Sequence, residues 1–118
     1  MKLTKTEEEI MQIIWEIAPC MVTEMIEHIG DPDIPHSTIS STVRALERKG
    51  YVGHKAYGRT HVYYPVVKRE EYSKSRLDKL VEDYFGGSAT RLVSFLIREK
   101  EVDVDGLHKI LDTLDENE

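Results

Sequence analysis

Prolines and glycines divide the first 67 residues of the chain into short elements. Pro19 closes the amphipathic segment TKTEEEIMQIIWEIA, and Gly30 offers a left-handed exit from a second segment, VTEMIEHI. The turn GDPDIPH that follows does not favour a helix. Gly50 ends a third amphipathic segment, and Gly58 lies between two short runs of strand character. The order helix, helix, turn, helix and two-stranded ribbon predicts a winged helix-turn-helix.

The first predicted helix begins with a capping box. Thr4 stands three residues before Glu7, the spacing at which each side chain binds a backbone N–H group that the first turn leaves free. Ile10, Ile14 and Ile17 then recur on one face. We therefore expect the helix to start after Thr4 and to bury its isoleucines.

The third helix is predicted over residues 37–50, with Ser37 as its N-cap. Ile39, Val43 and Leu46 are spaced to be buried together, which leaves hydroxyl and basic side chains on the opposite face. We predict that this face enters the major groove of DNA and that the wing, residues 51–66, contacts flanking phosphates. The predicted DNA-binding residues are Ser37, Thr38, Ser40, Ser41, Arg44, Arg48, Lys55 and Arg59.

The charge distribution favours the same segment. The chain has a net charge of −6, yet the segment between His36 and His61 contains five lysines and arginines and a single acidic residue, Glu47. This stretch therefore carries a formal charge of +4, which leaves −10 for the remainder. Such asymmetry is typical of a local nucleic-acid-binding surface on an acidic protein. A chance cluster on a solvated face is the alternative that charge alone leaves open.

Residues 68–118 are predicted to form three short amphipathic helices. Gly86 and Gly87 break the first, Ser88 begins the second and Asp103 can cap the third. Their apolar area is large for so few residues, so we expect a second copy of the chain to cover it, although folding back onto the winged domain is the alternative. The expected dimerisation residues are Leu92, Leu96, Leu107, Ile110, Leu111 and Leu114.

Catalysis, cofactors and metals find little support in the sequence. It contains no GxGxxG, GxxxxGK[ST], HExxH or GxSxG motif. We expect Cys20 to be a small structural thiol rather than a nucleophile. The five histidines are scattered and have no metal-ligand spacing. We expect the predicted ribbon to bring His54 and His61 close together, which makes a metal sensor conceivable, but histidines on opposite strands of a ribbon are more often surface polar residues. The single cysteine and the lack of a long apolar run or signal peptide predict a cytoplasmic protein without membrane insertion.

The segments LTKTEEEIMQIIW, STISSTVRALERKGYVGHKAYGRTHVYYPVV and DYFGGSATRLVSFL resemble the BlaI/MecI/CopY family of bacterial repressors, which control β-lactamase, methicillin-resistance and copper-transport genes. The resemblance covers essentially the whole chain. It implies a winged-helix DNA-binding domain, here residues 1–67, followed by a helical dimerisation domain, here residues 68–118. It also implies a homodimer that binds palindromic operators in promoters. The most diagnostic residues are Leu3, Thr4, Glu7, Ile10, Met11, Trp15, Thr38, Ile39, Leu46, Lys49, Gly50, Tyr64 and Pro65.

Departures from the family pattern limit what else the resemblance implies. The copper branch has paired cysteines near its C-terminus, whereas this chain has none after Cys20, which argues against a copper sensor of that type. In the β-lactam branch, a membrane-linked signalling pathway leads to cleavage of an Asn-Phe bond. The equivalent bond here is Ser94-Phe95, so a protease of such a pathway is a hypothetical partner. The family often has Thr at Ser41 and Arg at Ala45, so the operator sequence can differ as well.

Two other functions remain open at this point. A winged-helix protein-interaction module would turn the same basic helix toward an acidic partner, and a preference for palindromic DNA would separate the two. A metal- or ligand-responsive regulator of another winged-helix family would need a ligand set, which the sequence does not show.

Overall fold

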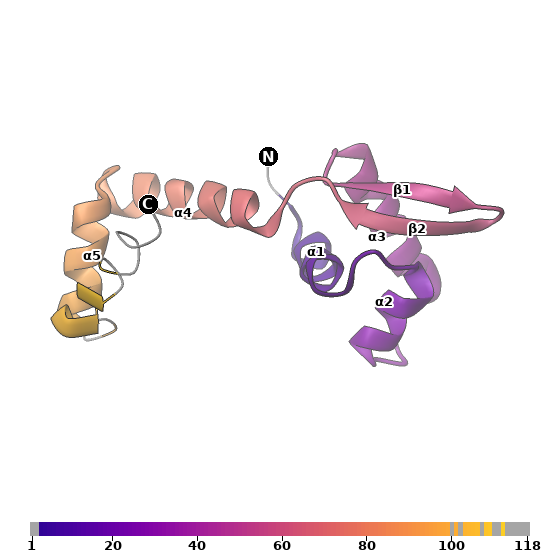
Figure 1. Cartoon of the computed structure of the whole chain (residues 1–118), viewed down its shortest axis with the longest axis horizontal. Coiled ribbons are helices and arrows are strands. Elements are labelled where there is room, and N and C mark those ends of the chain that lie inside the picture. The colour runs from indigo at the N-terminus through magenta and orange to yellow at the C-terminus, as the bar shows by residue number, and fades with distance from the viewer. Residues whose placement is uncertain (1–2, 100, 102, 107, 110–111, 113–118) are drawn as a thin grey trace. The chain divides into compact units, whose positions relative to one another are not determined.

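The computed structural model describes residues 3–99, 101, 103–106, 108–109 and 112. The chain divides into two compact units, Met1–Tyr72 and Ser73–Glu118. In order, the elements are α1 (Lys5–Ile17), α2 (Val22–Ile29), α3 (His36–Arg48), β1 (Val52–Tyr57), β2 (Thr60–Pro65), α4 (Arg69–Phe85) and α5 (Ala89–Arg98) (Figure 1). This order confirms the predicted fold class, mainly helical with a two-stranded wing after a helix-turn-helix.

The start of α1 confirms the predicted capping box. Thr4 Oγ1 accepts a hydrogen bond from the backbone N–H of Glu7 at 3.1 Å, and Glu7 Oε1 accepts one from the N–H of Thr4 at 2.8 Å. The helix ends at Ile17, just before the Ala18-Pro19 bond. Both ends of α1 are thus fixed by residues that the sequence singles out.

The prediction for the start of α3 was wrong. The helix begins at His36 with Pro35 as its N-cap, so Ser37 lies in the first turn and does not cap it. Pro35 has φ −64° and ψ 142°, an extended conformation that suits the residue before a helix. Because proline reaches this geometry without a side-chain hydrogen bond, the helix starts two residues before the position that a Ser37 cap requires.

The core of the first unit lies where the three helices meet the ribbon, and α3 contacts α1, α2 and β1. The predicted burial of Ile39, Val43 and Leu46 is confirmed, since none is more than 1% exposed. Burying such side chains stabilises the fold by about 1.5–3 kcal/mol each. The largest fully buried side chains are Ile10, Met11, Ile14, Met25, Ile39, Leu46, Val43 and Cys20.

Strands β1 and β2 pair antiparallel, with His54 opposite Tyr63 and Ala56 opposite His61. Gly58 adopts φ +65° at the tip, as the turn between the strands requires. Alternation along β2 buries Tyr63 but leaves Tyr64 39% exposed. The face of the ribbon that carries His54, His61 and Tyr63 is therefore the face turned to the helices.

The first turn of α4 belongs to the first unit. Tyr72 donates a hydrogen bond from its hydroxyl to Glu8 Oε2 at 2.9 Å, and its ring lies 5.5 Å from that of Trp15. Trp15 Nε1 in turn donates to the carbonyl of Val67 at 2.9 Å. These contacts tie the segment after the wing to α1, and the compact unit accordingly extends to Tyr72.

The second unit contains the rest of α4, together with α5. Gly86 and Gly87 take φ values of 59° and 80° between the two helices, and Ser88 caps α5 by accepting the N–H of Arg91 at 3.2 Å. Residues 104–106 are also helical, and Asp103 Oδ1 accepts the N–H of Gly106, as the predicted cap requires. None of the described helices is long and apolar enough to cross a membrane.

Candidate nucleic-acid interface

Helix α3 presents a basic outer face opposite its buried one. Arg44 and Arg48 are exposed on this face. In the described part of the chain, neither guanidinium lies within ion-pair distance of a carboxylate, because the four ion pairs there involve other residues. Both arginines are therefore available to an anionic partner.

Hydroxyl groups surround these arginines. Ser37, Thr38 and Ser41 are exposed and Ser40 is partly buried. The hydroxyl of Ser41 donates to the carbonyl of Thr38 at 3.0 Å, and that of Ser40 lies 3.2 Å from His36 Nδ1. A hydroxyl that donates in this way still has lone pairs to accept a hydrogen bond, so the surface offers acceptors as well as cationic donors.

The wing contributes two further cations. Lys55 is exposed on β1, on the face of the ribbon opposite His54, and Arg59 is exposed at the tip beside Gly58. Neither forms an ion pair within the described residues. We call Arg44, Arg48, Lys55 and Arg59 the basic surface.

A polar cluster links α3 to the wing next to the basic surface. Glu47 Oε2 lies 2.6 Å from His54 Nδ1, and the ring of His54 stacks on that of His61 with centroids 4.3 Å apart. Burial and the Glu47 carboxylate raise the pKa of Tyr63, which Arg44 partly offsets. The proximity of His54 and His61 is confirmed, but no three His, Cys, Asp or Glu side chains of the described residues gather as a metal site.

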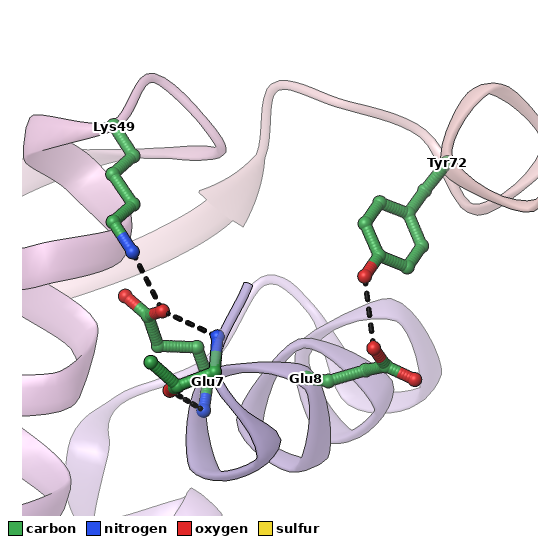
Figure 2. A network of polar contacts seen from close by, with 5 residues as sticks. Glu7, Glu8, Lys49 and Tyr72 are labelled. Carbon is green, nitrogen blue, oxygen red and sulfur yellow. Dashed lines mark hydrogen bonds and ion pairs between the residues drawn. The ribbon is translucent and has the colours of Figure 1, made fainter. Parts of the chain in front are cut away.

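Lys49 differs from the other cations of its segment. Its Nζ lies 2.7 Å from Glu7 Oε1, and its side chain is 34% exposed against 6% for that of Glu7 (Figure 2). Burial alone would raise the pKa of Glu7, but hydrogen bonds from Lys49 and Thr4 outweigh it and hold the pKa below its ordinary value of 4.5. Glu7 is therefore ionised at neutral pH, and the sequence-based charge count of the segment includes one cation that is already paired.

The model of the penicillinase repressor family matches residues 3–116. The chain belongs to this family. It is 20% identical over 117 residues to the penicillinase repressor of Bacillus licheniformis, covering 98% of this chain and 91% of that protein. It is 21% identical over 114 residues to the methicillin resistance regulatory protein MecI of Staphylococcus aureus strain N315, covering 96% and 93%, and equally to MecI of Staphylococcus epidermidis.

Membership confirms the resemblance seen in the sequence. Penicillinase repressors are DNA-binding transcriptional regulators rather than enzymes, and the chain is a repressor of the BlaI/MecI type. Dimer formation is consistent with this family. The exposed face of α3 and the wing are thus the candidate surface for DNA.

The remaining predicted site residues lie in the second unit. Leu92 and Leu96 of α5 are half-buried, whereas Leu107, Ile110, Leu111 and Leu114 lie outside the described residues. Ser94 and Phe95 are both within α5, and the ring of Phe95 lies 5.6 Å from that of Phe85. The bond that the sequence predicts as a possible cleavage site is therefore part of a helix.

Proposed function

We propose that the repressor binds its operator with α3 in the major groove and with the β1–β2 ribbon on the adjacent phosphates. One observation carries this proposal: four exposed cations, the basic surface, have no acidic partner within the described residues. Their attraction to phosphate releases counterions and supplies affinity for any DNA. The winged domain, residues 1–67, performs this binding.

Sequence preference comes from α3. Arg44, in the middle of the exposed face, can bind the O6 and N7 atoms of a guanine with both arms of its guanidinium. The small side chains of Ser37, Thr38, Ser40 and Ser41 let the helix approach closely and accept or donate hydrogen bonds. Arg48, Lys55 and Arg59 bind phosphates and set the register.

We also propose that residues 68–118 join two copies, which then bind a palindromic operator. Supporting this, α5 has no buried residue in the single chain, and large apolar side chains of the second unit are exposed. Leu77 is 50% exposed, Leu80 41% and Tyr84 79%. A second copy of the chain would cover this exposed apolar surface. The proposed contact residues are Leu92, Leu96, Leu107, Ile110, Leu111 and Leu114.

Selection of bound sequences from a random duplex pool tests this function, using the purified protein at fixed, near-physiological salt. Enrichment of a two-fold symmetric motif with half-sites about one helical turn apart is the expected result. Analytical ultracentrifugation of the same sample should give the mass of two chains. A pool without enrichment would support the protein-interaction module instead, in which the basic surface meets an acidic partner.

Cleavage of Ser94-Phe95 by a protease of a membrane-sensor pathway is the proposed means of derepression. Cleavage within α5 would weaken the dimer. Because two linked subunits bind the two half-sites with a high effective concentration, separating them would lower the affinity for the operator. Exposure of cells to a β-lactam, followed by immunoblotting, should reveal a fragment from the wild-type protein and none from Phe95→Ala. Persistence of the intact wild-type protein alone would contradict this proposal.

A further inference from the structure

Lys49 stands at the junction between α3 and the wing. It caps the C-terminus of α3, with its backbone N–H bound to the carbonyl of Ala45 at 3.0 Å. Tyr51 N–H then bonds to the carbonyl of Leu46 at 3.0 Å, and β1 begins at the next residue, Val52. A displacement of Lys49 would therefore move the last turn of the helix and the first residue of the wing together.

Glu7 holds Lys49 from a fixed position on α1. The oxygen that receives the Lys49 ammonium, Oε1, also accepts the backbone N–H of Thr4, while the N–H of Glu7 is bound by the Thr4 hydroxyl (Figure 2). The carboxylate cannot follow Lys49 outward without breaking this cap. The helix behind it is anchored in the core, since Ile10 and Ile14 are no more than 2% exposed.

The basic surface is split across this junction. Arg44 and Arg48 precede Lys49 on α3, whereas Lys55 and Arg59 follow it on the ribbon. Both pairs have to contact one duplex at the same time, so small errors in their relative position weaken binding. A second polar contact, between Glu47 and His54, also spans this junction, and Glu7–Lys49 adds a polar contact from the junction to α1.

We propose that Glu7 and Lys49 are positioning residues of the DNA interface, which hold α3 and the wing in the relative position that DNA binding requires without contacting DNA themselves. This inference rests on the proposed function. It differs from two simpler roles. Lys49 is not one more phosphate ligand, although its charge and place in the sequence point that way, and the ion pair does more than stabilise the fold.

Salt dependence separates a positioning residue from a phosphate ligand. The logarithm of the binding constant falls with the logarithm of salt concentration in proportion to the number of phosphates neutralised, so losing one phosphate contact flattens the slope by about one unit. We would measure binding of the selected duplex between about 50 and 200 mM salt for wild type, Lys49→Met, Lys49→Arg, Glu7→Gln and the double variant. Arg59→Ala serves as the matched control that removes a proposed phosphate contact.

The proposal expects Lys49→Met and Glu7→Gln each to weaken binding about tenfold at every salt concentration, with the wild-type slope retained. The double variant should be no weaker than the poorer single variant, because both changes break the same contact. Lys49→Arg keeps a charged donor and should restore most of the affinity. All variants are compared at a temperature where their unfolding curves show the native state.

Three results would overturn the proposal. A slope flattened by about one unit in Lys49→Met, with Glu7→Gln unaffected, would make Lys49 a phosphate ligand. Wild-type affinity in the folded Lys49→Met and Glu7→Gln proteins would leave the pair with a purely structural role. Loss of the native state in both would make the pair a determinant of the fold itself. Failure of the proposed function is distinguishable, because the wild-type protein would then bind no duplex and Arg59→Ala would change nothing.

Discussion

Cys20 and Tyr63 exchange two backbone hydrogen bonds, from Cys20 N to Tyr63 O at 3.0 Å and from Tyr63 N to Cys20 O at 2.7 Å. This isolated bridge attaches the segment between α1 and α2 to the outer edge of β2. It satisfies backbone groups that the two-stranded ribbon would otherwise leave unpaired on that side. As a result, the base of the wing is held to the helical core, and the Cys20 side chain is completely buried.

Burial in this position should make the Cys20 thiol unreactive. Burial, with a smaller contribution from the Glu24 carboxylate, raises the pKa of the thiol to about 11. Because alkylation requires the thiolate, only about one molecule in a thousand is reactive at about pH 8, and access is blocked besides. We expect iodoacetamide to leave the native protein unmodified and to add one group in denaturant, as measured by intact mass. Stoichiometric labelling of the native protein would contradict the buried position.

Gly30 should be sensitive to substitution by alanine. It ends α2 at φ 67°, in the left-handed region, and its N–H bonds to the carbonyl of Ile26 at 3.1 Å. A Cβ atom is strained in this conformation, so Gly30→Ala should lower the free energy of unfolding by about 1 kcal/mol in urea denaturation. Thr23→Ala on the exposed face of the same helix is the control and should change it by less than about 0.5 kcal/mol. Equal stability of Gly30→Ala and wild type would contradict this reason.

The pH dependence of stability should report on Glu7. Its pKa is lowered in the folded chain, so its stabilising contribution is complete above its ordinary pKa of 4.5 and is lost as the pH falls through the lower folded value. Glu7→Gln should therefore reduce the free energy of unfolding by about 1–3 kcal/mol at about pH 7 and show a shallower acid-induced loss. Denaturation curves from about pH 7 down to about pH 3 measure both quantities.

The control for Glu7 is Glu9→Gln, an exposed acid on the same helix. The side chain of Glu9 makes no hydrogen bond or ion pair to any described residue, so this change should leave both the stability near neutral pH and its acid dependence close to wild type. Parallel pH profiles for Glu7→Gln and wild type would show that the Glu7–Lys49 pair does not contribute as its geometry indicates.

Local chemistry is enough to predict most of the fold. The capping box at Thr4, the left-handed glycines at 30 and 58, and the periodic burial of Ile39 all depend on residues within one or two turns of each other. The start of α3 was missed because two residues close together, Pro35 and Ser37, both suit an N-cap. Sequence spacing alone does not decide between a proline's fixed φ and a serine's hydrogen bond.

Long-range pairing is what the sequence does not reveal. Lys49 looks like one more cation of a basic segment, because its partner Glu7 lies 42 positions away and already has a local role in the capping box. The Tyr72–Glu8 contact, 64 positions apart, is equally invisible and extends the first compact unit into α4.

In the proposed interface, we expect Arg44 to contribute sequence specificity and Arg59 to contribute affinity for any DNA sequence. Arg44 lies on the exposed face of α3, so Arg44→Ala should cost about 1–3 kcal/mol on the selected operator and relax discrimination at one base pair. Arg59 lies at the tip of the wing, so Arg59→Ala should weaken binding to all duplexes alike and flatten the salt slope by about one unit. Titrations of the selected duplex and a scrambled duplex of equal length measure both effects. If the two variants lose equal affinity on both duplexes, α3 does not read bases through Arg44, and the basic surface as a whole contacts only the phosphates.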